Sequence, residues 1–99
     1  MKVVYARRAM TDIANIGADS RRLFGDSVSL ALETTIRACV ARIDLMPEIG
    51  QRVAQRPDVR VIPLVRYPFK IFYRVTDESV TVLHIRHASR QPWPGDQPR

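Results

Sequence analysis

The stretch that decides the fold runs from Val59 to Arg90 and reads VRVIPLVRYPFKIFYRVTDESVTVLHIRHASR. It is rich in Val, Ile, Phe and Tyr, which favour strands, and it divides into three runs: Val59–Arg66, Phe69–Thr76 and Val80–His87. A proline cannot donate a hydrogen bond within a sheet, so Tyr67-Pro68 separates the first two runs. Asp77-Glu78-Ser79 is short enough for a hairpin turn between the last two. The stretch therefore predicts a three-stranded antiparallel sheet.

Side chains alternate between the two faces of a strand, so the parity of a position predicts its face. The odd-numbered positions are almost wholly apolar and are predicted to face the core: Val59, Val61, Pro63, Val65, Phe69, Ile71, Tyr73, Val75, Thr81, Leu83, Ile85 and His87. The even-numbered positions hold every Arg and Lys of the strands, with apolar residues between them: Arg60, Ile62, Leu64, Arg66, Lys70, Phe72, Arg74, Val80, Val82, His84 and Arg86. A bulge at Tyr67-Pro68 would flip one strand relative to the next. The even-numbered face is either a solvated surface or a binding surface for an acidic amphipathic partner or nucleic acid.

The composition indicates one small basic domain. A chain of 99 residues is long enough for a single core, and its formal net charge is +6 with a pI of about 10.4. The charge is uneven: residues 1–58 carry nine Lys or Arg against seven Asp or Glu, and residues 59–99 carry seven against three. Such a charge suits nucleic acid and acidic proteins equally.

Cysteine content and hydropathy exclude several classes of protein. Cys39 is the only cysteine, which rules out an intramolecular disulfide and a cysteine-based metal cluster. It lies in a helical apolar stripe, and we expect a small buried side chain there. No apolar run approaches the roughly 20 residues that span a bilayer, and the start MKVVYARR lacks a signal-peptide core. We therefore expect a cytoplasmic protein with no metal, no cofactor and no membrane partner.

The N-terminal half predicts a strand and a first helix. Lys2–Ala6 is a short β-type run that suits a strand added to the sheet. A helical period begins at Arg7 or Arg8 and is predicted to end at Gly25, as a left-handed cap. Its polar residues, such as Asp12, are expected to point away from the core. Its apolar stripe recurs at spacings of three and four: Ala9, Ile13, Ile16, Ser20 and Leu23 or Phe24.

A second helix follows and is predicted to end at Met46-Pro47, because the residue before proline avoids the α region. Asp26 or Ser27 can cap its start. Its stripe comprises Val28, Leu32, Ile36, Cys39, Ile43 and Met46. Two such helices joined by a short turn predict an antiparallel hairpin that packs on one face of the sheet. The predicted fold is therefore α+β, in the order β-α-α-β-β-β.

The remaining segments are predicted to be irregular. Pro47–Asp58 contains two prolines and Gly50, and we expect a loop there. Residues 1–90 are predicted to form one domain. Residues 91–99 contain three prolines and few apolar residues, which predicts an extended or disordered tail. Trp93 in this tail either folds back onto a groove or meets a partner.

Three motifs of the chain are characteristic. They are the loop Pro47-x-x-Gly50, the segment RVIPLVRYPFKIFYRV from Arg60 to Val75, and the ending VLHIRHASR from Val82 to Arg90. With the order of strand, helical hairpin and sheet, they resemble the RelE/ParE superfamily of toxins from bacterial type II toxin–antitoxin modules, and in particular its ParE-like branch. The resemblance covers residues 2–90.

The resemblance implies one of two activities. RelE-like members cut mRNA on the ribosome, which requires a base, an acid and cations around the phosphate, whereas ParE-like members poison DNA gyrase. An RNase site in this chain would comprise Arg60, Arg74, Arg86 and His87. No tyrosine follows Tyr73, whose parity predicts a buried, hydrogen-bonded phenol, and no acid is evident. We therefore expect a gyrase inhibitor without catalytic residues, with the RNase as the alternative.

The resemblance also implies a hetero-oligomer with a cognate antitoxin. Such antitoxins resemble a ribbon-helix-helix dimer of the ParD type whose acidic C-terminal segment folds on the toxin. We expect this segment to contact the even-numbered face of the sheet at Arg60, Ile62, Leu64, Arg66, Phe72, Arg74 and Arg86. The residues expected to meet gyrase are Arg86, His87, Arg90 and Trp93.

Overall fold

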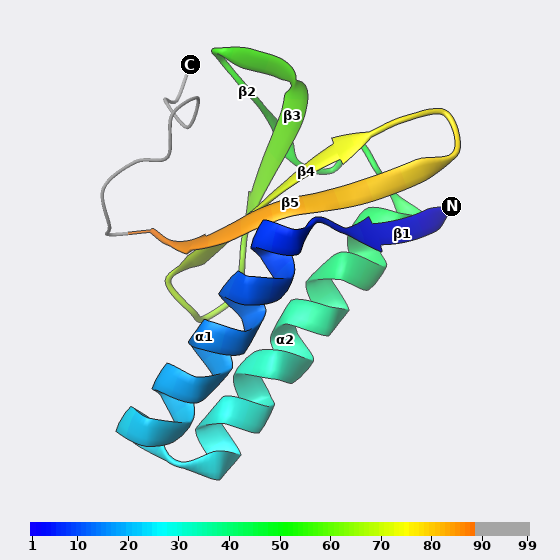
Figure 1. Ribbon diagram of the computed structural model, residues 1–99. Coiled ribbons are helices and arrows are strands. Elements are labelled where there is room, and N and C mark those ends of the chain that lie inside the picture. The colour runs from blue at the N-terminus through cyan, green and yellow to red at the C-terminus, as the bar shows by residue number, and fades with distance from the viewer. Residues whose placement is uncertain (89–99) are drawn as a thin grey trace.

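The structure is a computed structural model that describes residues 1–88 (Figure 1). Among these residues, two helices and five strands follow one another: β1 (Lys2–Tyr5), α1 (Arg7–Phe24), α2 (Asp26–Leu45), β2 (Gln51–Val53), β3 (Arg56–Pro63), β4 (Phe69–Val75) and β5 (Ser79–His87). The predicted tail of residues 91–99, with Trp93, and the preceding Arg90 lie outside the described residues. Neither of the two described helices is long and apolar enough to cross a membrane.

The strands form one mixed sheet in the order β1-β5-β4-β3-β2. β1 runs parallel to β5, and all other neighbouring strands are antiparallel. The α+β class is confirmed, and Lys2–Tyr5 joins the sheet as predicted. The prediction of a three-stranded sheet is wrong, because β1 and β2 add a strand at each edge. Gln51–Val53 lies in the segment predicted as a loop, and three residues are too few to show a strand pattern.

The helices form the predicted antiparallel hairpin, with Gly25 between them (Figure 1). Gly25 has a φ of 92°, which favours glycine, and its N–H donates to the carbonyl oxygen of Arg21 at 2.9 Å. Neither Asp26 nor Ser27 caps α2. Gly25 itself occupies the cap position, and Asp26 already lies in the first turn of the helix.

The predicted helical stripes are buried or partly buried along most of both helices, but not beside the Gly25 turn or after the end of α2. Ala9 and Ile43 are completely buried, whereas Leu23 and Phe24 are 60% and 66% exposed. Met46, which follows α2, is also exposed. Figure 1 shows the cause at the Gly25 end, because the hairpin extends beyond the sheet and no strand covers its last turn.

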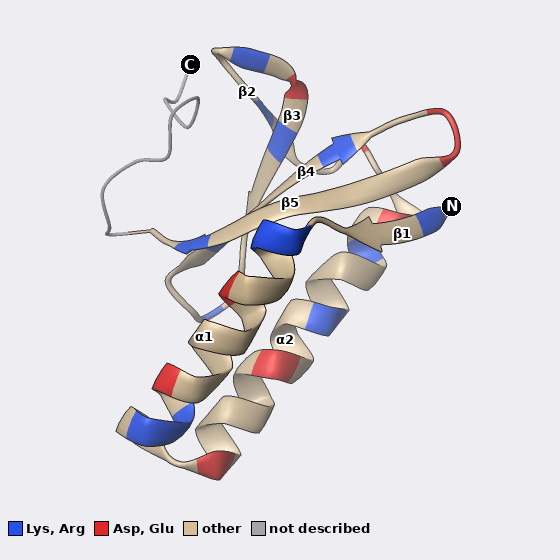
Figure 2. Cartoon of the chain, viewed as in Figure 1, with Lys and Arg blue, Asp and Glu red and all other residues tan. Residues whose placement is uncertain are grey.

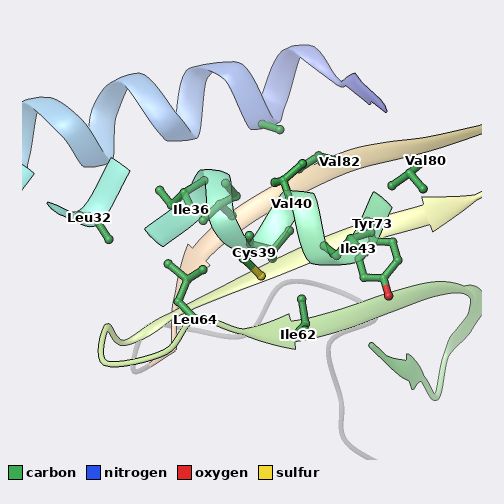
Figure 3. Packing of buried hydrophobic residues seen from close by; sticks show 13 residues of the cluster. Leu32, Ile36, Cys39, Val40, Ile43, Ile62, Leu64, Tyr73, Val80 and Val82 are labelled. Atoms are coloured by element: carbon green, nitrogen blue, oxygen red, sulfur yellow. The ribbon is translucent and has the colours of Figure 1, made fainter. Parts of the chain in front are cut away.

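The main core lies between α2, α1 and the sheet, as Figure 3 shows. Cys39 is buried in it as predicted, and this burial raises the pKa of its thiol. The sheet side of the core comes from β3, β4, β5 and the residue after β3: Ile62, Leu64, Ile71, Tyr73, Val80, Val82 and Ile85. Several of these have even numbers, so the parity prediction fails in part of the sheet.

In β3 the parity is reversed. Ile62 lies directly opposite Ile71 of β4, so an even-numbered residue shares the helix-covered face with an odd-numbered one. The turn that contains Tyr67-Pro68 shifts the count by one between the two strands. Arg60 and Leu64 consequently lie on the helix-covered face with Ile62, not on the opposite face as predicted.

In β5 a bulge reverses the parity partway along the strand. Phe72 lies opposite His84, but Tyr73 lies opposite Val82, so Leu83 is an extra residue on β5. The even-numbered valines before the bulge therefore face the helices. Ile85, which follows it, faces them as predicted. The sheet thus has a helix-covered face and an uncovered face, but the division by residue number changes along the chain.

Tyr73 ties the loop after α2 to the sheet. Its hydroxyl donates to the carbonyl oxygen of Pro47 and accepts from the N–H of Gly50, both at 2.8 Å. The side chain is completely buried, as predicted, and burial raises the pKa of its phenol. A Cβ on Gly50 would lie 2.7 Å from this hydroxyl, so only glycine fits there without a shift. The Pro47-x-x-Gly50 motif therefore supplies both hydrogen-bond partners of the buried Tyr73 hydroxyl.

We expect Tyr73→Phe to lower the free energy of unfolding by about 1–3 kcal/mol. The substitution removes the hydroxyl that pairs with the Gly50 N–H and the Pro47 carbonyl oxygen, and it leaves both backbone groups without this partner. Tyr5→Phe is the matched control, because that residue is 36% exposed, and it should change stability by less than about 0.5 kcal/mol. Urea unfolding followed by circular dichroism measures both. Equal midpoints for the two variants would contradict the anchoring role.

Candidate functional site: a groove beside α1 and the uncovered face of the sheet

A groove of about 1030 Å³ runs along α1. Its other walls are the start of α2, the turn between β3 and β4, and the end of β5. At the start of α1 the lining is polar, with two arginines, one carboxylate and two histidines: Arg8, Asp12, His84, Arg86 and His87. Toward the Gly25 turn it is mainly apolar, although Asp19 and Ser20 also line it: Ile16, Leu23, Phe24, Val28 and Leu32.

The position of α1 depends on the unequal lengths of β1 and β5. β1 ends at Tyr5, opposite Val82, whereas β5 continues to His87. The edge of β5 beyond Val82 is closed by a carboxylate, because Asp12 Oδ2 accepts a hydrogen bond from the N–H of Ile85 at 3.0 Å. A side chain of α1 thus takes the place of the missing strand residues.

The same carboxylate holds His84. Asp12 Oδ2 lies 2.6 Å from His84 Nδ1, and Arg8 Nε lies 3.5 Å from the other carboxylate oxygen. His84 is 4% exposed, and its ring stacks on that of Phe72 with centroids 5.8 Å apart. Burial lowers the pKa of His84, and the hydrogen bond that the Asp12 carboxylate accepts from it opposes this without overcoming it. His84 is therefore a structural link between α1 and the sheet.

The apolar end of the groove is open to solvent. Leu23 and Phe24 form its outer lip and are more than half exposed, while Leu32 is buried at its base. Exposed large apolar side chains beside a groove are a feature of surfaces that bind another protein. The groove therefore combines an apolar seat with cationic groups at the opposite end of α1.

The predicted antitoxin-binding set does not form one surface. Ile62 and Leu64 are 7% and 6% exposed in the core beneath the helices, and Phe72 is completely buried on the other face. Arg60 donates from Nη1 to the carbonyl oxygen of Gly50 at 2.8 Å and so belongs to the loop anchor. The expectation of a single apolar and cationic trough is wrong, because the turn after β3 reverses that strand. The binding roles of the individual residues remain predictions.

The other members of this set are at the surface. Arg66 lies in the turn after β3 and has a positive φ of 74°. Arg74 makes an ion pair with Asp58, with Nε and Oδ2 2.9 Å apart. Arg86 lies over the ring of Phe72, 5.9 Å from its centroid, and donates from Nη1 to the backbone oxygen of its neighbour at 2.8 Å. Arg74 and Arg86 occupy the uncovered face.

The proposed RNase residues are not brought together either. Arg60 is on the helix-covered face, and Arg74 and Arg86 are at different levels of the uncovered face. Arg86 is the partner of Lys70, four residues before Arg74, which corresponds to about 13 Å along a strand. The rings of His87 and Phe69 form a T-shaped pair with centroids 5.2 Å apart, and His87 lines the groove. Within residues 1–88 no cluster of three His, Cys, Asp or Glu side chains could hold a metal ion.

Sequence reasoning missed the residues of α1 that shape the groove. Asp12 was expected to point away from the core, yet it contacts β5, and Leu23 or Phe24 was expected in the stripe, yet both are exposed. The helical spacing allows either Leu23 or Phe24 in the stripe, and it gave no signal that both would be exposed. For Asp12 the pattern gave no signal.

The fold is shared with solved structures of proteins from toxin–antitoxin systems. It is similar to the chromosomal ParDE toxin–antitoxin system from P. aeruginosa, with a TM-score of 0.73 and 24% identity, over 90% of this chain and 97% of that chain. It is also similar to the intact E. coli RelBE toxin–antitoxin complex, with a TM-score of 0.60 and 22% identity, over 90% and 98%. The isolated E. coli RelE toxin is similar as well, with a TM-score of 0.60 and 21% identity, over 91% of this chain and 86% of that chain.

The sequence assigns the family within this class. Residues 3–92 match the family of ParE toxins of the type II toxin–antitoxin system parDE. The chain therefore belongs to the ParE toxin family of the RelE/ParE superfamily, as its motifs predict. None of the curated proteins compared with it is significantly similar in sequence.

The buried His84 predicts that stability falls in mild acid. Its pKa is below the ordinary 6.5 in the folded chain, so between these values the unfolded chain holds a proton that the folded chain lacks. Stability that is present above pH 6.5 should be lost as the pH falls through the folded pKa. Urea midpoints from about pH 8 to about pH 5 measure this, and His84→Gln should flatten the dependence. Identical pH slopes in the two proteins would contradict this assignment.

Proposed function

We propose that this chain is a toxin that inhibits DNA gyrase in the cytoplasm and is neutralised by a cognate antitoxin. The match of residues 3–92 to the ParE family carries the proposal. The separation of Arg60, Arg74 and Arg86 supports it, because an RNase needs its cations around one phosphate. The toxin would act by binding, without a catalytic residue and without a cofactor.

The groove beside α1 is the proposed seat of the antitoxin. An amphipathic segment that carries both apolar residues and carboxylates would match the two ends of the groove. The apolar residues would contact Leu23 and Phe24, and the carboxylates would approach Arg8 and Arg86. The chromosomal ParDE system from P. aeruginosa and the E. coli RelBE complex are toxin–antitoxin assemblies of the same fold, which supports a partner of this kind. Charge would set the orientation of the segment, and apolar burial its affinity.

The proposed target is tested by two cell-free assays run side by side. The purified toxin should abolish supercoiling of relaxed plasmid by gyrase and should leave labelled mRNA intact on translating ribosomes. The reason is that the described residues form no phosphate-centred set of acid, base and cations. Cuts in the message at regular codon positions, with normal supercoiling, would instead establish the RNase activity of the RelE-like alternative.

The proposed antitoxin seat is tested by a pair of substitutions on α1. Leu23→Glu should weaken antitoxin binding about tenfold or more, because it replaces an apolar contact with a charge that repels the acidic segment. Met10→Glu is the matched control, since Met10 is 61% exposed against 60% for Leu23 and does not line the groove. Isothermal titration with the purified antitoxin measures both. Equal affinities for the two variants would remove the groove from the interface.

A further inference from the structure

A second pocket, the α2 pocket, borders the turn between β3 and β4. Its volume is about 310 Å³. One wall is α2 and the other is the turn itself, and the lining includes Thr34, Ala38, Cys39, Arg42, Val65 and Arg66. The groove beside α1 also meets this turn, at Tyr67 and Pro68. Val65 and Tyr67 are two residues apart, at most about 7 Å along the chain, so the same short turn borders both cavities.

The charge that lines the α2 pocket is positive. Arg42 lies in the last turn of α2 and Arg66 in the turn after β3, and none of the described residues that line the pocket is Asp or Glu. The turn between β3 and β4 carries a basic residue and no acidic one (Figure 2). None of the salt bridges among residues 1–88 includes either arginine. An anion that enters the pocket would therefore be attracted by both guanidinium groups.

Arg66 occupies its position at a conformational cost. Its φ of 74° lies in the left-handed region that favours glycine, and it is the one non-glycine residue among residues 1–88 with a positive φ. Glycine would serve the backbone of this turn at least as well as arginine. What arginine adds is a cationic side chain beside the α2 pocket. A strained backbone position that carries such a side chain points to a binding role.

Exposed apolar side chains accompany the two arginines. Val65, in the lining, is 60% exposed, and Leu30 and Leu45 of α2 are 64% and 81% exposed. A protein segment that carries apolar residues beside its carboxylates would cover such side chains. A nucleic-acid backbone offers no apolar side chain, and no aromatic ring among the described lining residues could stack on a base. The surface therefore favours an acidic peptide over a nucleic acid.

We propose that the α2 pocket is a second contact of the antitoxin, occupied by an acidic part of the same amphipathic segment after the segment crosses the turn between β3 and β4. The inference rests on the proposed function, because it extends the antitoxin interface beyond the groove. Carboxylates of the segment pair with Arg42 and Arg66, and an apolar residue beside them covers Val65. Two contacts on one segment strengthen each other, because the first holds the second at a high effective concentration.

Isothermal titration of the toxin with the purified antitoxin, in about 50 and about 500 mM salt, tests the proposal. Arg66→Gly and Arg42→Gln should each weaken binding severalfold in low salt and by less in high salt, because salt screens exposed ion pairs. Arg66→Gly is the stricter variant, since glycine suits the backbone of this turn and the urea midpoint should be nearly unchanged.

Arg52→Gln is the matched control. It removes one exposed cation from β2, outside both the groove and the α2 pocket, and should leave the affinity for the antitoxin unchanged. Equal affinities for Arg66→Gly and Arg52→Gln would overturn the proposal. A toxin that forms a dimer without the antitoxin, and whose dimer is dissociated by Leu45→Glu, would also overturn it, because a second copy of the chain would then cover this face.

The Leu23→Glu variant separates this inference from the proposed function. If Leu23→Glu weakens antitoxin binding while Arg66→Gly and Arg42→Gln do not, the antitoxin occupies the groove alone, and only the α2 pocket is contradicted. If the antitoxin does not bind the unmodified toxin, the neutralisation in the proposed function is contradicted, and the inference with it.

Discussion

The edge of β5 is closed partly by a strand and partly by the carboxylate of Asp12, and the rest of the architecture follows from this arrangement. β1 covers β5 as far as Val82, and beyond this point the chain has already turned into α1. Asp12 receives the N–H of Ile85 and holds His84, so the helix is fixed against the sheet edge by polar contacts in addition to the apolar core. The groove exists because α1 is fixed at its start and diverges from the sheet toward Gly25.

Two local irregularities decide which side chains of the sheet are accessible. The turn at Tyr67-Pro68 places Ile62 and Arg60 beneath the helices, and the bulge at Leu83 does the same for the valines of β5. Because the side-chain period of a strand is two, each shift of one residue exchanges the covered and uncovered faces. Arg60, which the sequence suggested as a binding residue, lies on the helix-covered face and donates to the carbonyl oxygen of Gly50.

The two surfaces that remain differ in chemistry. The groove offers exposed apolar side chains at one end and cations at the other, which suits an acidic amphipathic segment of a protein. On the uncovered face, Lys70 and Arg86 are opposite partners on β4 and β5, and the rings of Phe72 and His84 are buried.

The sequence by itself determined the order of the main elements, the helical hairpin, the buried Cys39 and Tyr73, and the family. These depend on local periodicity, on proline and glycine, and on motifs that are contiguous along the chain. Only the tertiary structure decided the extra strand β2, the face on which each β3 and β5 residue lies, and the contact of Asp12 with β5. Their cause is pairing between distant segments, since a three-residue strand and a one-residue bulge acquire meaning only against the neighbouring strand.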